Sequence, residues 1–208
     1  MWRTTPMHRA EVPGSLAEDR PPPLAPGVPD DEVQWPEDGA GPLFHRRYRT
    51  RIREAQRSPE ELMSMVSRSP DCVAPTEFAS FQKVFGDKDR MAVGDEFVVR
   101  MPGPWDGPVR VVDKTPTSFR LATLEGHLEA GQIEFTVRRD GDEIVFLIES
   151  WARSGDRFSD LLYDHVRMAK EIQLHMWTSV LERVAELAGG RLTGGIEIRT
   201  RRVDVDAS

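Results

Sequence analysis

His127 and Glu129 are the two side chains whose types and spacing best suit chemistry. A histidine changes its protonation state near neutral pH, and a neighbouring carboxylate can orient it, so the pair can act as a general base and its orienting acid. A second interpretation is structural. His127 follows Gly126, and a histidine beside a turn glycine often hydrogen-bonds the backbone of its own loop. The residues alone leave both interpretations open.

The other reactive residues are too scattered to form a metal centre or a cysteine site. His165 and His175 are ten residues apart, which on a helix separates them by about 15 Å, so they cannot share a metal ion. Cys72 is the single cysteine, and without basic neighbours we expect it to be inert. No metalloprotease, esterase or nucleotide-binding motif occurs. We therefore expect no metal and no cofactor.

Composition narrows the class of protein. The chain has 208 residues, of which 38% are hydrophobic, and this is enough for one ordinary domain. Its formal net charge of -7 argues against a surface that neutralises nucleic-acid phosphates, so we expect no nucleic-acid partner. The sequence contains neither an export signal nor a run of about 18 apolar residues. We expect a cytoplasmic protein with no membrane span.

Residues 1–42 differ in composition from the rest of the chain. They hold nine of the 16 prolines and three arginines against eight acidic residues, with almost no helical or strand periodicity. Low hydrophobicity, high charge and clustered proline are typical of disorder, so we expect a disordered, proline-rich acidic arm. Trp2 and Trp35 offer an alternative, in which the arm docks onto a protein partner or onto the chain's own domain.

Regular patterns begin at residue 43. Aromatic residues at 44 and 48 with arginines between them predict a strand over 43–52 at a sheet edge, with the arginines either on its solvated face or in an anion site. Ser58 caps a predicted helix that has Pro59 at its first position and a carboxylate at its third. Thr76 caps a second short helix that extends to residue 85.

The spacing of apolar residues changes twice in the second half of the chain. Residues 94–152 alternate polar and apolar residues, which predicts antiparallel strands joined by short turns, with Asp140 and Gly141 in a tight hairpin. Residues 156–187 carry apolar residues at three- and four-residue steps, which predicts one long amphipathic helix. Residues 191–208 are predicted to form a short final strand or a tail.

A curved sheet wrapped around the long helix would cover both apolar faces, and this order of elements resembles the START-like helix-grip superfamily, also called SRPBCC. Within it, residues 123–135 are similar to a signature of the domain-of-unknown-function family nineteen-ninety. The matching residues are Thr123, Leu124, Gly126, His127, Glu129, Gly131 and Phe135. Leu128 and Gln132 replace a proline and a glutamate of that signature. The resemblance implies an α+β helix-grip fold over residues 43–190, here with two short helices after the first strand, and it carries no established activity.

A strand that begins near His127 would place a polar pair at one end of an apolar face, as in many ligand sites. Trp105 can cover the open end as a lid, or pack against the adjacent loop. A completely filled core is the alternative to a cavity. The residues that we expect to line the cavity are Phe97, Val99, Met101, Trp105, Phe119, Leu121, His127, Glu129, Ile133, Phe135, Phe146, Ile148, Ile172, His175, Met176 and Trp177.

These patterns favour a non-enzymatic domain that binds a small apolar or amphipathic molecule. Two alternatives belong to other classes of protein. One is an interaction or scaffold protein that captures its partner through residues 1–42. The other is a cyclase- or hydratase-like enzyme that uses His127 and Glu129, for which fold analogy is the main support.

Overall fold

The computed structural model describes residues 5–77, 79–101, 106–155 and 163–205, with the backbone alone for 155 and 163–172. Within these residues the chain forms one nine-stranded sheet, and neighbouring strands are antiparallel except for the parallel pair β1 and β9. The strands, in their order across the sheet, are β1 (Met7–Pro13), β9 (Arg191–Val203), β2 (Gly39–Arg53), β8 (Glu143–Gly155), β7 (Glu129–Asp140), β6 (Ser118–Thr123), β5 (Asp106–Thr115), β4 (Glu96–Arg100) and β3 (Ser80–Phe85).

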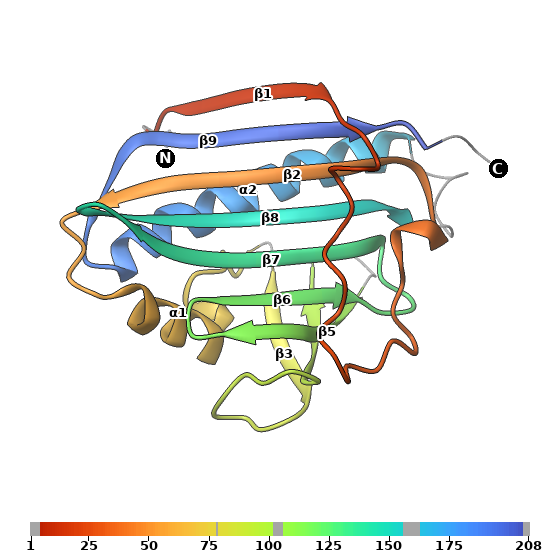
Figure 1. Cartoon of the computed structure of the whole chain (residues 1–208), viewed down its shortest axis with the longest axis horizontal. Helices are drawn as coiled ribbons and strands as arrows, with labels where there is room; N and C mark the ends of the chain where they lie inside the picture. Colours follow the sequence, from red (N-terminus) through yellow and green to blue (C-terminus); the bar gives the residue numbers. More distant parts are fainter. Residues whose placement is uncertain (1–4, 78, 102–105, 156–162, 206–208) are drawn as a thin grey trace.

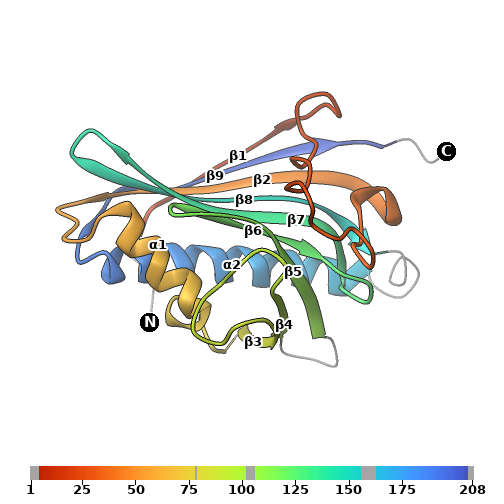
Figure 2. The same cartoon turned by 60° about the horizontal axis from the view of Figure 1, so that its bottom comes forward.

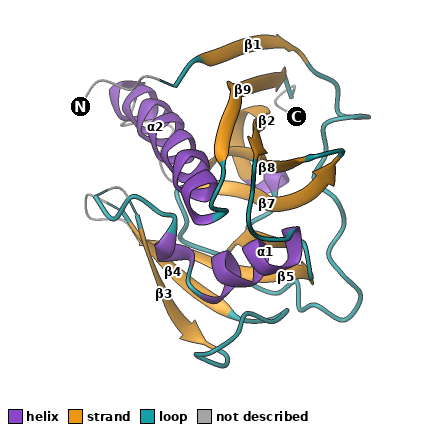
Figure 3. Ribbon diagram, turned by 90° about the vertical axis from the view of Figure 1, so that its left-hand side faces the viewer, coloured by secondary structure: helices purple, strands orange, loops and turns teal. Residues whose placement is uncertain are grey.

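Two α-helices lie on the concave side of this sheet. α2 (Tyr163–Leu187) runs behind the long strands, and α1 (Pro59–Arg68) lies beside it (Figures 1 and 2). Seen from the end of the molecule in Figure 3, the strands form an open arc around both helices. Among the described residues, neither helix combines the length and the apolar character that crossing a membrane requires. The curved sheet with both helices on its concave side confirms the predicted helix-grip architecture.

The main hydrophobic core lies between the concave face and the two helices. Leu181 and Val184 of α2 and Leu62 of α1 are completely buried in it. Alternate residues of a strand face opposite sides of a sheet, so Tyr48 and Ile52 of β2 join this core, while the odd-numbered residues between them face the convex side.

Several local predictions are confirmed. The Glu61 N–H donates to the Ser58 hydroxyl at 3.2 Å, and the Ser58 N–H donates to the Glu61 carboxylate at 2.8 Å, which together form the predicted capping box of α1. β7 and β8 are joined by the predicted tight hairpin, in which Asp140 lies opposite Glu143. The long C-terminal helix is present, although its predicted start near residue 156 lies outside the described residues.

The prediction of a second short helix over residues 76–85 is wrong. Residues 80–85 form β3, which pairs with β4 so that Phe81 lies opposite Val99 and Lys83 opposite Phe97. The Lys83 ammonium also donates to the Asp95 carboxylate at 2.6 Å, which anchors the strand beside β4. The apolar spacing of this segment suits a helix, but the pairing with β4 decided its conformation.

The prediction that residues 43–52 form an edge strand is also wrong. β2 pairs with β8 on one side and with β9 on the other, so it lies inside the sheet. Residues 191–203 form β9, and thus take the strand rather than the tail alternative. A chain segment that returns from about 140 residues away pairs with the side of β2 that was expected to be free, and such a pairing has no signature in the local sequence of β2.

The described part of the N-terminal segment lies on the sheet, where composition predicted a disordered arm. β1 pairs with β9, and residues 14–38, which we call the strap, cross the convex face in front of β8, β7 and β6 (Figure 1). Strap residues Leu24, Val28 and Trp35 pack against a second apolar cluster. That cluster consists of Val33, Val112, Ala122 and Leu124.

Arginines of the convex face supply hydrogen bonds that a proline-rich strap cannot make with itself, because proline lacks a backbone N–H. Arg120 donates to the Pro23 carbonyl at 2.8 Å, and Arg110 donates to the Asp31 carbonyl at 2.8 Å. Both arginines are almost fully buried. Their bonds and the apolar cluster are long-range contacts, which composition cannot reveal.

We expect Val33→Ala to destabilise the protein by about 1 kcal/mol, because Val33 is a strap residue whose side chain is buried against Val112, Ala122 and Leu124 on the sheet side. Leu16→Ala is the matched control, since Leu16 is an exposed strap residue and its loss should change stability by less than about 0.5 kcal/mol. Urea denaturation of both variants measures the difference. Equal stabilities for the two variants and the wild type would show that the strap does not pack on the sheet.

Candidate functional site

Side chains on the concave face form rows that cross neighbouring strands. The strand pairing defines three such rows. The outer row is nearest the end of the sheet at which β2 begins, and the inner row is farthest from that end. The inner row is Ile196, Thr50, Phe146 and Val137. The middle row is Ile198, Tyr48, Ile148, Phe135 and Phe119. The outer row is Thr200, Arg46, Ser150, Ile133 and Leu121.

Burial decreases from the inner row to the outer row. No inner-row side chain is more than 1% exposed, and no middle-row side chain is more than 6% exposed. In the outer row Leu121 is buried, but the other four residues are partly exposed. Ile133 is informative because β7 is a central strand, where an apolar side chain is normally sealed. Among the described residues, the concave face is therefore closed over the inner and middle rows and partly exposed along the outer row, which we call its open end.

Most of the predicted cavity wall lies in the closed part. The residues packed into the main core are Phe97, Phe119, Leu121, Phe135, Phe146 and Ile148. Val99, Ile133 and Trp177 are partly buried against that core, and Phe135 contacts Trp177 edge to face with ring centroids 5.7 Å apart. Met176 is buried, Met101 is partly exposed and His175 is exposed. Trp105 and the side chain of Ile172 lie outside the described residues.

His127 bonds to its own loop. Its Nδ1 accepts a hydrogen bond from the backbone N–H of Glu129 at 2.9 Å, and its Nε2 lies against Gly107, where an added Cβ would come within 2.9 Å of this atom. Burial lowers the pKa of His127, and the nearby Glu129 charge opposes this only in part. The bond joins the ring to the Glu129 backbone rather than to its carboxylate, so the geometry matches the structural interpretation of this pair.

The signature segment builds the connection between β6 and β7 at the open end. The Thr123 hydroxyl accepts from the Gly131 N–H at 2.9 Å and lies 3.1 Å from the Gln34 carbonyl, to which it can donate. Gln34 of the strap donates in turn to the backbone carbonyls of His127 and Glu129, each at 3.1 Å. These bonds make the signature residues a framework that holds one wall of the opening.

A buried charge cluster lies on the opposite, convex face. His45 Nδ1 donates to Asp19 Oδ1 at 2.6 Å, and His45 Nε2 donates to Glu149 Oε1 at 2.6 Å. The imidazole also stacks on Trp151 at 5.1 Å. Carboxylates only accept, so both ring nitrogens carry hydrogen and the ring is an imidazolium. This arrangement ties the strap to β2 and β8.

The pKa values of this cluster follow from its geometry. Burial would lower the pKa of His45, but its hydrogen bonds to Glu149 and Asp19 outweigh burial and raise the pKa above 6.5. Burial likewise works to raise the pKa of Asp19, but its bonds to His45 and to the Ser15 N–H lower the pKa below 3.8. Both shifts therefore favour the charged forms of His45 and Asp19.

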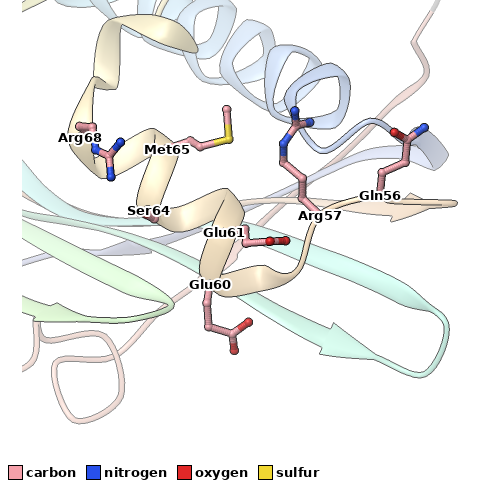
Figure 4. Close-up of a pocket in the computed structure, with 7 residues that line it drawn as sticks. All are labelled: Gln56, Arg57, Glu60, Glu61, Ser64, Met65 and Arg68. Carbon is pink, nitrogen blue, oxygen red and sulfur yellow. The ribbon is translucent and has the colours of Figure 1, made fainter.

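Two surface hollows accompany these features. A cavity of about 220 Å³ beside the charge cluster is lined by Glu18, Asp19, His45, Arg47, Arg199 and Arg201. An open groove of about 680 Å³ follows α1 (Figure 4), where Glu61 caps the helix and Arg57 bonds the Leu187 carbonyl at the end of α2. The Glu61 and Arg57 contacts are structural, and among the described residues no group of His, Cys, Asp and Glu side chains is placed to hold a metal ion.

Sequence reasoning missed the charge cluster and the polar part of the outer row. Asp19 lay in the segment expected to be disordered, and His45 lay among arginines expected to be solvated. Strand alternation could have placed His45 and Arg46 on opposite faces. It could not have supplied Asp19, Ser150 or their positions, because these come from distant segments.

We expect Thr123→Val to destabilise the protein by about 1–3 kcal/mol, because it leaves the buried Gly131 N–H without an acceptor while conserving side-chain volume. Thr136→Val is the control, since Thr136 lies on the same sheet and is only partly buried. Thermal or urea denaturation measures both variants. A neutral result for Thr123→Val would contradict the framework role of the signature.

The charge cluster predicts a stability profile with pH. His45 has a higher pKa in the folded protein than in the unfolded chain, where the pKa is 6.5. Its full contribution to stability is therefore present when the pH is below 6.5, and this contribution disappears as the pH rises through the folded-state pKa. Asp19, whose pKa is lowered, contributes above pH 3.8 and loses its contribution as pH falls through the folded value. We therefore expect unfolding midpoints in urea to decline above pH 6.5, and His45→Gln to flatten this decline.

Arg49→Gln provides the control for that profile. Arg49 lies on the same strand and face, and its ion pair with Glu197 at 2.7 Å is exposed, so its loss should cost less than about 1 kcal/mol. The slope above pH 6.5 should persist in this variant. An unchanged slope in His45→Gln would exclude His45 as its cause.

The solved structures similar to this chain include two with TM-scores above 0.5, and these two support the fold. Norcoclaurine synthase from Thalictrum flavum, in complex with dopamine and hydroxybenzaldehyde, is similar with a TM-score of 0.51 and 12% identity over 73% of this chain and 88% of that chain. The di-domain ARO/CYC StfQ from the steffimycin biosynthetic pathway has a TM-score of 0.53 and 9% identity over 74% and 52%. A major latex-like protein from Panax ginseng has a TM-score of 0.48 and 12% identity over 68% and 96%.

Sequence comparison identifies the family. No curated protein matches the chain. The model of the family described as "Domain of unknown function (DUF1990)" matches residues 76–183, which include the signature segment and more than half of the chain. The predicted resemblance is thus confirmed at the level of both family and fold. The chain belongs to the DUF1990 family and has the Bet v1-like, helix-grip fold of the SRPBCC superfamily.

Proposed function

We propose that this protein binds a small apolar or amphipathic molecule on the outer row of the concave face, beside α2. The observation that carries the proposal is the partial exposure of Ile133 in the centre of a nine-stranded sheet. An apolar side chain at such a position gains free energy when another apolar surface covers it. The inner and middle rows are filled by protein and supply a rigid floor for the site.

The fold suits this function. Norcoclaurine synthase, which shares it, has been solved with two small aromatic molecules, dopamine and hydroxybenzaldehyde. That likeness supports the ability of the fold to hold a small molecule and says nothing of which molecule this chain takes. The mixture of apolar and polar groups along the outer row is typical of ligand sites, where a few polar groups orient an otherwise apolar ligand.

Binding accounts for the geometry better than the two alternatives. The enzyme hypothesis requires His127 and Glu129 to act together, but the Nδ1 of His127 is already bonded to a backbone N–H. The scaffold hypothesis requires a free N-terminal arm, but the strap is packed on the convex face and bonded to Arg110 and Arg120. Neither alternative explains the exposed outer row.

Ile133→Trp tests the proposal by filling the outer row with a larger side chain. We expect it to weaken the binding of the neutral dye Nile red roughly tenfold, because the indole occupies the space that the dye requires. The measurement is a fluorescence titration, accompanied by thermal denaturation. Leu147→Trp is the matched control, since Leu147 is a partly exposed apolar residue on the convex face of the neighbouring strand.

Two results would contradict the proposal. One is the absence of Nile red binding to the wild-type protein together with no small molecule in native mass spectra of the freshly purified protein. The other is equal weakening by Ile133→Trp and Leu147→Trp, which would place the dye outside the outer row.

A further inference from the structure

The outer row contains three adjacent polar side chains on three neighbouring strands. Arg46 of β2 lies opposite Thr200 of β9 on one side and opposite Ser150 of β8 on the other. Neighbouring strands are about 4.8 Å apart, so the guanidinium and the two hydroxyls belong to one small patch. All three side chains are partly exposed. Within the part of the chain that the structure describes, none of them makes a side-chain hydrogen bond.

Arg46 differs from the other arginines of β2. Those on the convex face all have acidic partners: Arg47 lies 3.2 Å from Glu149, Arg49 lies 2.7 Å from Glu197, and Arg51 and Arg53 lie 3.0 and 2.7 Å from Glu143. Arg46 is the arginine of this strand that faces α2, and among the described residues no carboxylate lies within ion-pair distance of it. Its guanidinium lies 4.4 Å above the Phe44 ring, toward the open end.

The neighbouring groups do not neutralise this cation. The Tyr48 phenol, one row further in, is uncharged, because burial raises its pKa to about 12. His127 is also held in its neutral form by burial, which lowers its pKa. Glu129 lies close enough to act on Tyr48 electrostatically, but so does the second cation Arg9. A partly buried guanidinium that has no acidic partner among the described side chains is an incomplete arrangement, which an external anion can complete.

The chemistry of that anion follows from the donors. One planar guanidinium with two neutral hydroxyls suits a single negative charge spread over two oxygens, which is a carboxylate. A dianionic phosphate would bring a second charge that the patch does not match. Ile133 follows Ser150 in the same row and is partly exposed, so apolar surface begins directly beside the polar patch.

We propose that the ligand is an amphipathic carboxylate, whose acidic headgroup is bound by Arg46, Ser150 and Thr200 and whose apolar part lies against Ile133. This inference rests on the proposed function, because it assigns the headgroup of the same ligand. It names a class of molecule that includes medium-chain fatty acids and aromatic acids.

The test compares dodecanoate with dodecanol as competitors that displace Nile red, below the concentration at which dodecanoate forms micelles. The two molecules share an alkyl chain and differ in the headgroup. We expect dodecanoate to bind the wild-type protein roughly tenfold more tightly than dodecanol, as is typical of a charge-assisted hydrogen-bonded pair. Arg46→Gln should remove this preference by weakening dodecanoate alone, and Ser150→Ala should reduce it.

Arg47→Gln is the matched control, because it removes the next arginine of the same strand on the opposite face. It should keep the preference for dodecanoate. Thermal denaturation of each variant verifies folding. Arg46→Lys keeps the positive charge but loses the paired N–H donors of the guanidinium, so it should retain part of the preference for dodecanoate.

The outcomes separate this inference from the proposed function. If dodecanol and dodecanoate displace the dye equally well, or if Arg46→Gln leaves the preference intact, the carboxylate assignment is overturned while apolar binding stands. If the wild-type protein binds neither the dye nor either competitor, the proposed function fails and the assignment fails with it. Loss of the preference in Arg46→Gln together with its retention in Arg47→Gln supports the assignment.

Discussion

The register of β2 between β8 and β9 controls where the important charges of this protein lie. Tyr48 lies opposite Ile148 on one side and Ile198 on the other, and these apolar contacts hold the alternation in place. A slip of one residue would turn His45 into the apolar interior and Arg46 toward the strap. The first change would bury His45 away from its two carboxylate partners, so the apolar core and the charge cluster favour the same register.

Because of this register, the two faces of the sheet differ in how their charges are paired. On the convex face, His45, Asp19 and Glu149 form a closed cluster in which each charge has a partner. The strap covers much of that face, with its carbonyls bonded to buried arginines. On the concave face, Arg46 has no acidic partner among the residues that the structure describes. The proposed ligand would therefore complete its interactions on the concave side.

Residue size explains why the concave face is closed at one end and open at the other. The inner and middle rows contain Phe146, Phe135 and Phe119, which belong to one core cluster with Leu62 of α1 and Leu181 of α2. The outer row has Ser150 on the strand next to Ile133, and Gly131 follows one step further out. An added Cβ at Gly131 would lie 1.9 Å from the Trp151 carbonyl oxygen, so β7 requires glycine for its close approach to β8. At the outer end, small residues thus occupy positions on β7 and β8 where the inner and middle rows have phenylalanines.

Local patterns in the sequence predicted much of the fold. The capping box at Ser58, the alternation over residues 94–152, the hairpin at Asp140 and the apolar stripe of α2 each depend on interactions within a few residues, so they are legible without a structure. The signature at residues 123–135 identified the family for the same reason, because its hydrogen bonds lie mostly within one connection between two strands.

What the sequence determined by itself was therefore the set of elements, the helix-grip class and the family. Only the tertiary structure decided that residues 80–85 form a strand, that the strap packs on the sheet and that β2 is internal. The same is true of the position of Arg46 opposite Ser150 and Thr200. Each of these features depends on contacts between segments far apart in the chain. Their free energy arises only when the sheet is assembled, and no local pattern of residue types records it.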